Sequence, residues 1–247
     1  MKNSEGKKIV ILGGGFGGVR AALDLARLAR QTRIVLVDRN PYHIFTSDLY
    51  VLAGAFLPGR KLSSRDDFLK LRSAAAIPFE DIFEKYRNVQ VKIGEIGGID
   101  FAKKEVRTDT EKINYDFLIL ALGSQTNFFG IHNLNEKAFE LKSLNDVLNI
   151  RAALEEEFAS SGKQEKISIV IGGGGFTGCE LAGELASSAR LLAKRYGHPV
   201  ENFSIVILEG SDRLLPSAHP WISEKAKIRL ESLGVRVQLG SLIVDVT

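Results

Sequence analysis

An apolar run followed by a glycine turn occurs twice in this chain and limits what it can fold into. The first copy is residues 9–18, IVILGGGFGG, and the second is residues 169–178, IVIGGGGFTG. In each copy, a run typical of a buried parallel strand leads through the glycines into a helix. A second apolar run follows each copy, at 33–37 and at 203–208. The repeat therefore predicts two strand–helix–strand units and an α/β fold with two doubly wound domains.

The composition supports an ordinary folded chain. The 247 residues leave room for two domains, and 45% hydrophobic with 26% charged residues is usual for globular proteins. A net charge of +3 without a clustered basic face argues against nucleic-acid binding. The single cysteine, Cys179, excludes an internal disulfide and fits a reducing cytoplasm. No run approaches the ~20 apolar residues of a membrane-spanning helix. We expect no metal site, because the four histidines are scattered: His43, His132, His198 and His219.

The first glycine turn has the spacing of a dinucleotide-binding motif. Gly13, Gly15 and Gly18 fit the pattern G-x-G-x-x-G. The first glycine permits a tight turn, the second lets the backbone approach a pyrophosphate, and the third lets the helix pack close to the strand. Asp38 ends the next strand, where a carboxylate accepts hydrogen bonds from an adenosine ribose. Because the strands, the helix and the acid are all present, the motif predicts a bound dinucleotide.

The second glycine turn repeats these roles in Gly173, Gly175 and Gly178, with Glu209 at the end of the following strand. A carboxylate at that position repels the 2′-phosphate of NADPH, so Glu209 predicts NADH. Arg213 lies nearby in the sequence and could instead bind such a phosphate, which leaves NADPH as the alternative.

The region between the two copies has a different pattern. Four short alternating runs, at 89–93, 95–100, 105–108 and 112–115, predict an antiparallel meander inserted in the first domain. Residues 117–122 are predicted to form a fully apolar strand, and 60–75 is a polar, basic surface segment. The remaining pattern predicts helices at 48–55, 79–86, 143–160 and 219–233, and a third parallel strand of the second domain at 235–239.

With two nucleotide sites in one chain, the sequence resembles the flavoproteins with two dinucleotide-binding domains, and among them the type II NADH dehydrogenases. The resemblance implies an incomplete Rossmann-like FAD domain at 1–140, a connecting helix and linker at 141–163, and an incomplete NADH domain at 164–247. It further implies transfer of hydride from NADH to FAD and of electrons to a quinone. The segments that carry the resemblance are 13–18, 37–45, 115–124, 127–130, 141–144 and 173–185.

The resemblance also implies roles for single residues. Glu180 would face the flavin and the nicotinamide as the catalytic residue, the alternative being a surface helix acid. Thr46 would lie near the flavin ring, and Ile96 would offer its backbone to the adenine. Leu122 stands where family members commonly carry threonine, so a hydroxyl contact with FAD is lost. The predicted cofactor-binding residues are Gly13, Gly15, Phe16, Gly17, Gly18, Asp38, Arg39, Thr46, Ile96, Ala121, Leu122 and Gly123 for FAD, and Gly173, Gly175, Phe176, Thr177, Gly178 and Glu209 for NADH.

Other readings differ in chemistry and in partners. Disulfide reductases of this fold need a cysteine pair, whereas Cys179 is single and predicted to be a small packed residue. The resemblance implies a longer protein, with a quinone pocket and membrane-attaching helices beyond Thr247. The resemblance implies that this longer protein lies at the cytoplasmic face of the membrane. It leaves open whether the protein forms a homodimer. Two alternatives remain, a sulfide:quinone oxidoreductase and an FAD- and NADH-sensing protein similar to apoptosis-inducing factor.

Overall fold

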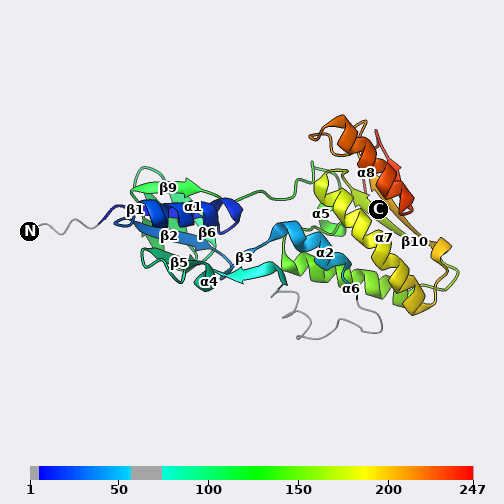
Figure 1. The fold of residues 1–247 in the computed structure, drawn as a ribbon, viewed down its shortest axis with the longest axis horizontal. Coiled ribbons are helices and arrows are strands. Elements are labelled where there is room, and N and C mark those ends of the chain that lie inside the picture. The colour runs from blue at the N-terminus through cyan, green and yellow to red at the C-terminus, as the bar shows by residue number, and fades with distance from the viewer. Residues whose placement is uncertain (1–5, 57–73, 247) are drawn as a thin grey trace, which may run out of the picture. The chain divides into compact units, whose positions relative to one another are not determined.

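The computed structural model describes residues 6–56 and 74–246, and the chain divides into two compact units (Figure 1). Unit 1 comprises Met1–Phe45 and Ser73–Gln125, and unit 2 comprises Thr46–Arg72 and Thr126–Thr247. Packing thus assigns a short piece of the N-terminal half to unit 2. The polar segment predicted at 60–75 lies, up to residue 73, outside the described residues.

Unit 1 is built on a four-stranded parallel sheet. Its strands are β1 (Lys8–Leu12), β2 (Arg33–Asp38), β5 (Val89–Ile93) and β9 (Phe117–Leu120), in the order β5-β2-β1-β9. Helix α1 (Phe16–Leu28) connects β1 to β2 across one face. This is the strand order of a Rossmann-type fold, in which ligands bind beyond the carboxyl ends of the strands where the order reverses. That point lies between β1 and β9.

The prediction of a four-stranded antiparallel meander was wrong in its first strand. β5 pairs with β2 in parallel, and only β6 (Ile96–Asp100), β7 (Glu105–Thr108) and β8 (Lys112–Asn114) form the antiparallel meander. β5 follows the helix α4 (Phe79–Phe83), a crossover that returns the chain in the direction of β2. As an edge strand it is half exposed, so its sequence alternates as an antiparallel strand does.

Both faces of this sheet are covered, because alternate residues of each buried strand point to opposite sides. Ile11 and Leu36 pack with small residues of α1 and with the phenylalanines of α4. Val10 and Val35 pack against Val106 of the meander on the other face. This double coverage explains why β1 and β2 are continuous apolar runs.

Unit 2 holds a second parallel sheet, of the strands β10 (Ile167–Gly172), β11 (Phe203–Leu208) and β12 (Val235–Gln238) in that order. The helix α7 (Phe176–Tyr196) connects β10 to β11, and α8 (Pro220–Ser232) connects β11 to β12. The predicted strand–helix–strand unit and its third strand are therefore confirmed.

Two further helices of unit 2 pack against α7: α6 (Leu144–Ser160) and α2 (Leu49–Gly54). Ser143 caps α6: its hydroxyl accepts the N–H of Asp146 at 3.2 Å, and the Asp146 carboxylate accepts the N–H of Ser143 at 2.8 Å. These two reciprocal hydrogen bonds form a capping box at the start of α6.

Several short elements had no clear sequence signal. The strands β3 (Tyr42–Ile44) and β4 (Ala76–Pro78) pair antiparallel in unit 1. Elements of three or four residues carry too few positions for a periodic pattern. Three further short elements of this kind lie in unit 2: η1 (Thr46–Asp48), α5 (Leu134–Lys137) and η2 (Val200–Asn202).

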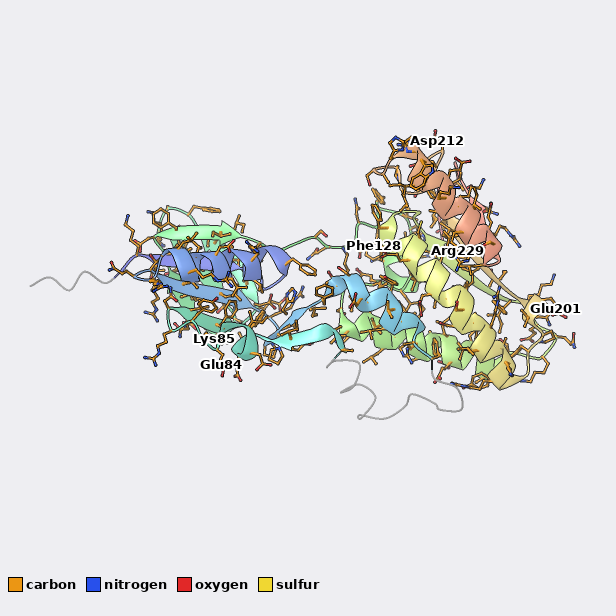
Figure 2. All side chains as sticks on the ribbon, viewed as in Figure 1. Glu84, Lys85, Phe128, Glu201, Asp212 and Arg229 are labelled. Carbon is orange, nitrogen blue, oxygen red and sulfur yellow. The ribbon has the colours of Figure 1, made fainter. Side chains whose placement is uncertain are left out.

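The charged side chains mix both signs on each unit, as Figure 2 shows for Glu84 and Lys85 of unit 1 and for Glu201, Asp212 and Arg229 of unit 2. All five are exposed. Among residues 6–56 and 74–246, no helix combines the length and the hydropathy needed to cross a membrane.

Candidate functional site

The first glycine turn adopts the geometry that its spacing predicts. Gly13 has φ of +100°, and its N–H donates to the carbonyl of Val37 at 2.8 Å. A Cβ on Gly18 would lie 1.8 Å from the Gly13 carbonyl oxygen, so α1 can approach the turn only through a glycine. A Cβ on Gly15 would meet nothing within 4 Å. The turn therefore leaves open space at Gly15, where a phosphate would approach.

The second turn, in unit 2, has the same geometry. Gly173 has φ of +102°, and its N–H donates to the carbonyl of Leu208 at 2.8 Å. A Cβ on Gly178 would lie 2.0 Å from the Gly173 carbonyl oxygen, and one on Gly175 would meet nothing within 4 Å. The sequence repeat is thus also a repeat of backbone conformation.

The middle glycine of each turn has a function that the motif spacing does not reveal. The N–H of Gly14 donates to the Asp38 carboxylate at 2.6 Å, and the N–H of Gly174 donates to the Glu209 carboxylate at 2.6 Å. A Cβ on Gly14 would lie 2.1 Å from the ring of Phe79, and one on Gly174 would lie 2.5 Å from a leucine side chain. The sequence feature that could have indicated this role of the middle glycine is the uninterrupted run of glycines in each copy.

Each acid is fixed by a second backbone N–H. The other oxygen of Asp38 accepts from Asn40 at 2.8 Å, and that of Glu209 accepts from Ser211 at 2.7 Å. Partial burial tends to raise the pKa of Glu209, but the hydrogen bonds from Ser211 and Gly174 outweigh it and lower that pKa. A carboxylate oxygen accepts more than one hydrogen bond, so both acids keep capacity for ribose hydroxyls.

Both turns open onto a helix N-terminus. The first intrahelical bonds run from Val19 to Gly15 in α1 and from Cys179 to Gly175 in α7, each at 3.0 Å. The preceding N–H groups have no intrahelical acceptor, and with the helix dipole they favour an anion such as a phosphate. The other residues predicted in these turns are exposed: Phe16, Gly17, Phe176 and Thr177.

The carbonyls of the middle glycines are held differently in the two turns. The Gly14 carbonyl lies 2.9 Å from Nδ1 of the buried His43, so this nitrogen carries the proton because a carbonyl only accepts. The Gly174 carbonyl accepts the N–H of Leu215 at 2.8 Å. The His43 ring also packs edge-on against Phe16, with centroids 4.9 Å apart. His43 is therefore a structural part of the first site, a role that its sequence position alone did not indicate.

The segment after β9 lies against the first turn. The Ala121 N–H donates to the Leu12 carbonyl at 2.8 Å, and a Cβ on Gly13 would lie 2.3 Å from the Ala121 carbonyl oxygen. Gly123 follows with φ of +74°, and the side chain of Leu122 is exposed. These residues stand at the sheet position where the strand order reverses.

Two further predicted residues lie near Asp38. Arg39 is exposed directly after it. Gly94 donates its N–H to the Asp38 carbonyl at 2.9 Å, which brings the start of β6 close to this acid. Ile96, the first residue of β6, pairs with Thr108 in the meander.

Thr46 and Glu180 belong to unit 2. Thr46 is exposed at the start of η1, and Glu180 is exposed in the first turn of α7. Burial raises the pKa of Tyr50 on α2, and the negative charges of Glu180, Asp48 and Glu184 raise it further. The start of α7 and the start of α2 therefore lie within electrostatic reach of each other.

Cys179 is buried, and its thiol lies 3.4 Å from the Gly174 carbonyl. Burial, followed by the charges of Glu209 and Glu180, raises the pKa of the Cys179 thiol to about 11. The helix N-terminus does not activate this thiol, which supports its reading as a packed residue. Across residues 6–56 and 74–246, no three metal-ligating side chains lie together.

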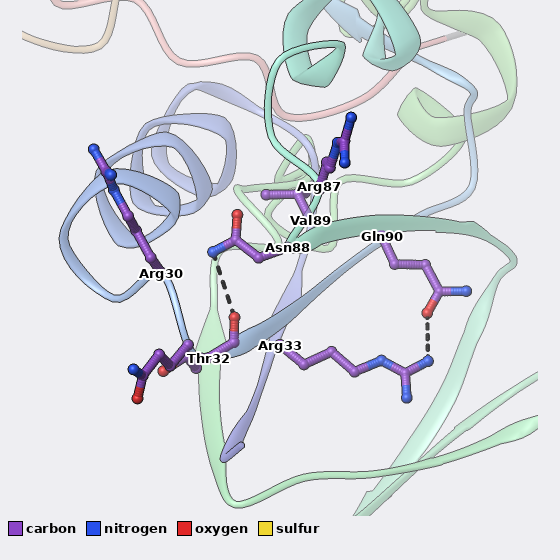
Figure 3. A pocket seen from close by; sticks show the side chains of 8 residues that line it. Arg30, Thr32, Arg33, Arg87, Asn88, Val89 and Gln90 are labelled. Carbon is purple, nitrogen blue, oxygen red and sulfur yellow. Dashed lines mark hydrogen bonds between the residues drawn. The ribbon is translucent and has the colours of Figure 1, made fainter. Parts of the chain in front are cut away.

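A hollow lined by Arg30, Arg33 and Arg87 lies before β2 and β5, at the amino ends of these strands and thus opposite the glycine turn. Figure 3 shows the three guanidinium groups pointing away from one another. Arg33 is also paired, donating to Gln90 at 2.8 Å. Because the charges do not converge, we assign no anion site to this hollow.

Comparisons with known proteins agree with this geometry. The family model of the pyridine nucleotide-disulphide oxidoreductases matches residues 7–247. A type II NADH:quinone oxidoreductase of Mycobacterium tuberculosis is 30% identical over 97% of this chain and 51% of that protein. The chain spans about half the length of the curated relatives it matches.

Two solved structures share the fold. The structure of NDH2 from Plasmodium falciparum in complex with NADH has a TM-score of 0.81 at 24% identity, covering 98% of this chain and 49% of that chain. The sulfide:quinone oxidoreductase of Aquifex aeolicus has a TM-score of 0.75 at 20% identity, covering 98% and 52%. The predicted α/β fold with Rossmann-type parallel sheets is confirmed.

Proposed function

Because this chain belongs to the pyridine nucleotide-disulphide oxidoreductase family, we propose that it forms the FAD- and NADH-binding part of a type II NADH:quinone oxidoreductase. The observation that carries the proposal is the pair of equivalent glycine turns, each with an acid bound to its middle glycine. One such turn serves one dinucleotide. Two such turns in one chain fit a protein that binds both a nicotinamide cofactor, which donates hydride, and a flavin, which accepts it.

The first turn would hold FAD, with residues 1–140 as the FAD-binding domain. The N–H groups at the start of α1 would bind the pyrophosphate, and Asp38 would accept from the adenosine ribose. Ala121, Leu122 and Gly123 would line the same cofactor, since the backbone of Ala121 and Leu122 lies against Gly13. The open space at Gly15 fits this assignment, because a phosphate must approach the backbone there.

The second turn would hold NADH, with residues 164–247 as the NADH-binding domain and 141–163 as the connection. Glu209 would accept from the ribose and repel the 2′-phosphate of NADPH. Arg213 donates one hydrogen bond to the carbonyl of Pro216 in its own loop at 2.8 Å and keeps further donors, so NADPH stays the alternative.

Bound FAD would accept hydride from NADH and pass the electrons to a quinone. Glu180 would lie at the junction of the two cofactors as the catalytic residue, with Thr46 near the flavin. Cys179 would take no part, because its raised pKa keeps the thiol protonated. A quinone acceptor dissolves in the membrane, so we place the whole protein at the cytoplasmic membrane surface, where NADH is available.

The test is anaerobic reduction of the FAD-bound holoenzyme by NADH, followed by addition of a short-chain quinone. We expect fast bleaching of the flavin by NADH and fast reoxidation by the quinone. Bleaching by sulfide but not by NADH would instead identify a sulfide:quinone oxidoreductase. Slow reduction to a long-lived charge-transfer complex would identify a nucleotide-sensing protein.

A further inference from the structure

The carbonyl of Gly14 meets a buried histidine side chain in unit 1. Nδ1 of His43 lies 2.9 Å from this oxygen and donates its proton to it, because a carbonyl only accepts. Gly14 and His43 are both buried, whereas Gly15, which follows directly, is exposed. The peptide bond between the two glycines therefore leads from the interior of the unit to its surface.

The N–H of this peptide bond belongs to Gly15 and points away from His43. The peptide is trans, so its C=O and its N–H point in opposite directions. In the part of the chain that the structure describes, the Gly15 N–H has no hydrogen-bond acceptor. A Cβ on Gly15 would meet nothing within 4 Å. A peptide fixed at its carbonyl, with its N–H left free beside open space, is suited to bind a phosphate oxygen.

The second turn holds the equivalent carbonyl through a different donor. The Gly174 carbonyl accepts the backbone N–H of Leu215 at 2.8 Å, and here too a buried glycine precedes an exposed one, Gly175. The same peptide is thus held in both turns, although the two donors are unrelated in sequence. The repetition indicates that this peptide must be held for the turn to work. In the first turn, that restraint depends on one side chain, which a substitution can remove.

The imidazole of His43 is itself fixed by its surroundings. Its residue lies on β3, where the backbone pairs with Ile77 of β4. Its ring packs edge-on against two phenylalanines, with centroids 4.9 Å from Phe16 and 6.5 Å from Phe45. Edge-to-face contacts favour one orientation of the ring. Nδ1 therefore keeps its direction toward the Gly14 carbonyl.

We propose that His43 is a positioning residue for FAD: its Nδ1–H holds the Gly14 carbonyl and so directs the Gly15 N–H to the pyrophosphate. The hydrogen bond also polarises the peptide, which strengthens its N–H as a donor. His43 acts through this peptide and not through contact with the flavin. The inference rests on the proposed function, since it requires FAD in the first turn.

The experiment compares the FAD dissociation constants of holoenzyme variants, measured from the flavin fluorescence that dilution releases. His43→Phe keeps an aromatic ring and removes the donor. We expect FAD binding to weaken roughly threefold to tenfold, the usual effect of one hydrogen bond. The affinity of the same holoenzyme for NADH should not change, because the second turn has its own donor in Leu215.

A second variant separates the donor from the shape of the ring. His43→Asn places an amide N–H where Nδ1 was, and its FAD dissociation constant should stay close to that of wild type. Asparagine fills the space of the imidazole less well than phenylalanine does. Rescue by asparagine would therefore not occur if His43 only filled space.

The matched control is His198→Phe in unit 2. Nε2 of His198 also lies next to a carbonyl, 2.7 Å from that of Phe158, and its ring is also edge-on to a phenylalanine, with centroids 5.8 Å apart. His198 is as buried as His43. The substitution should lower the stability of the protein as His43→Phe does, and should leave the FAD dissociation constant unchanged.

Unchanged FAD affinity in His43→Phe would overturn the inference, as would equal weakening in His43→Asn or in His198→Phe. If His43→Phe fails to fold, the tautomer of His43 decides, measured by NMR in isotope-labelled wild-type holoenzyme. A proton on Nδ1 supports the inference, and a proton on Nε2 alone overturns it. A wild-type protein without affinity for FAD would overturn the proposed function instead.

Discussion

Replacing Glu209 by glutamine removes one charge and keeps the size of the side chain. Both carboxylate oxygens already accept a backbone N–H, from Gly174 at 2.6 Å and from Ser211 at 2.7 Å. The amide nitrogen of glutamine cannot accept, so one of these donors loses its partner and the ribose loses part of its acceptor.

The expected magnitude follows from the charge on this acceptor. A hydrogen bond to a charged group contributes about 1.5–3 kcal/mol. Its loss should weaken NADH binding by roughly tenfold to a hundredfold. The binding of NADPH should weaken less, because the substitution also removes the repulsion between the carboxylate and the 2′-phosphate. The preference for NADH over NADPH should therefore shrink.

The assay is the concentration dependence of flavin reduction by each nucleotide, in wild type and in Glu209→Gln. The matched control is Asp38→Asn, which changes the equivalent acid of the first turn. It should lower the FAD content and leave the nucleotide preference of the remaining holoenzyme unchanged. Unaltered constants for both nucleotides in Glu209→Gln would refute the assignment of the second turn to NADH.

Three other predictions concern the same turns. Because the folded pKa of Glu209 is lowered from 4.5, its stabilising contribution is present above that pH and fades as the pH falls through the folded value. The melting temperature of wild type should therefore fall more steeply with decreasing pH than the melting temperature of Glu209→Gln. Cys179→Ala should keep NADH oxidation within a few fold, and wild-type Cys179 should resist iodoacetamide at neutral pH; loss of turnover with FAD still bound would contradict this. Gly14→Ala should destabilise the protein by about 1–3 kcal/mol in chemical unfolding, because the new Cβ overlaps Phe79. Position 15 faces open space, so Gly15→Ala should lower the FAD content without this loss of stability. Equal stability of the Gly14→Ala and Gly15→Ala variants would argue against the packing of Phe79 on Gly14.

Local patterns predicted most of what positions the two sites. The strand expected at 203–208 is β11, residue for residue, and the helix expected at 143–160 is α6, from Leu144 to Ser160. The first and third glycines of each motif have the conformations that their spacing implies, as at Gly13 and Gly173. These features depend on residues within one turn or one strand, so a single sequence window contains them.

Features that depend on distant residues escaped prediction. The direction of β5 depends on the crossover through α4, which its own alternating sequence does not record. The exclusion of a side chain at Gly14 depends on Phe79, far along the chain. The bond from Arg151 to Leu52 joins helices that have no sequence relation to each other. Tertiary packing determines each of these, and propensity carries no signal for it.

The two glycine turns have nearly the same backbone conformation, so we expect differences in their chemistry to come from side chains at equivalent positions. Position 20 carries an arginine that pairs with Asp24 within α1 at 2.7 Å. The equivalent position 180 carries a glutamate, which is exposed in the first turn of α7. A helix-surface pair such as that of Arg20 contributes little and serves only its own helix. The opposite charge at position 180 distinguishes the second turn from the first, and it supports our proposal that Glu180 acts between the two cofactors.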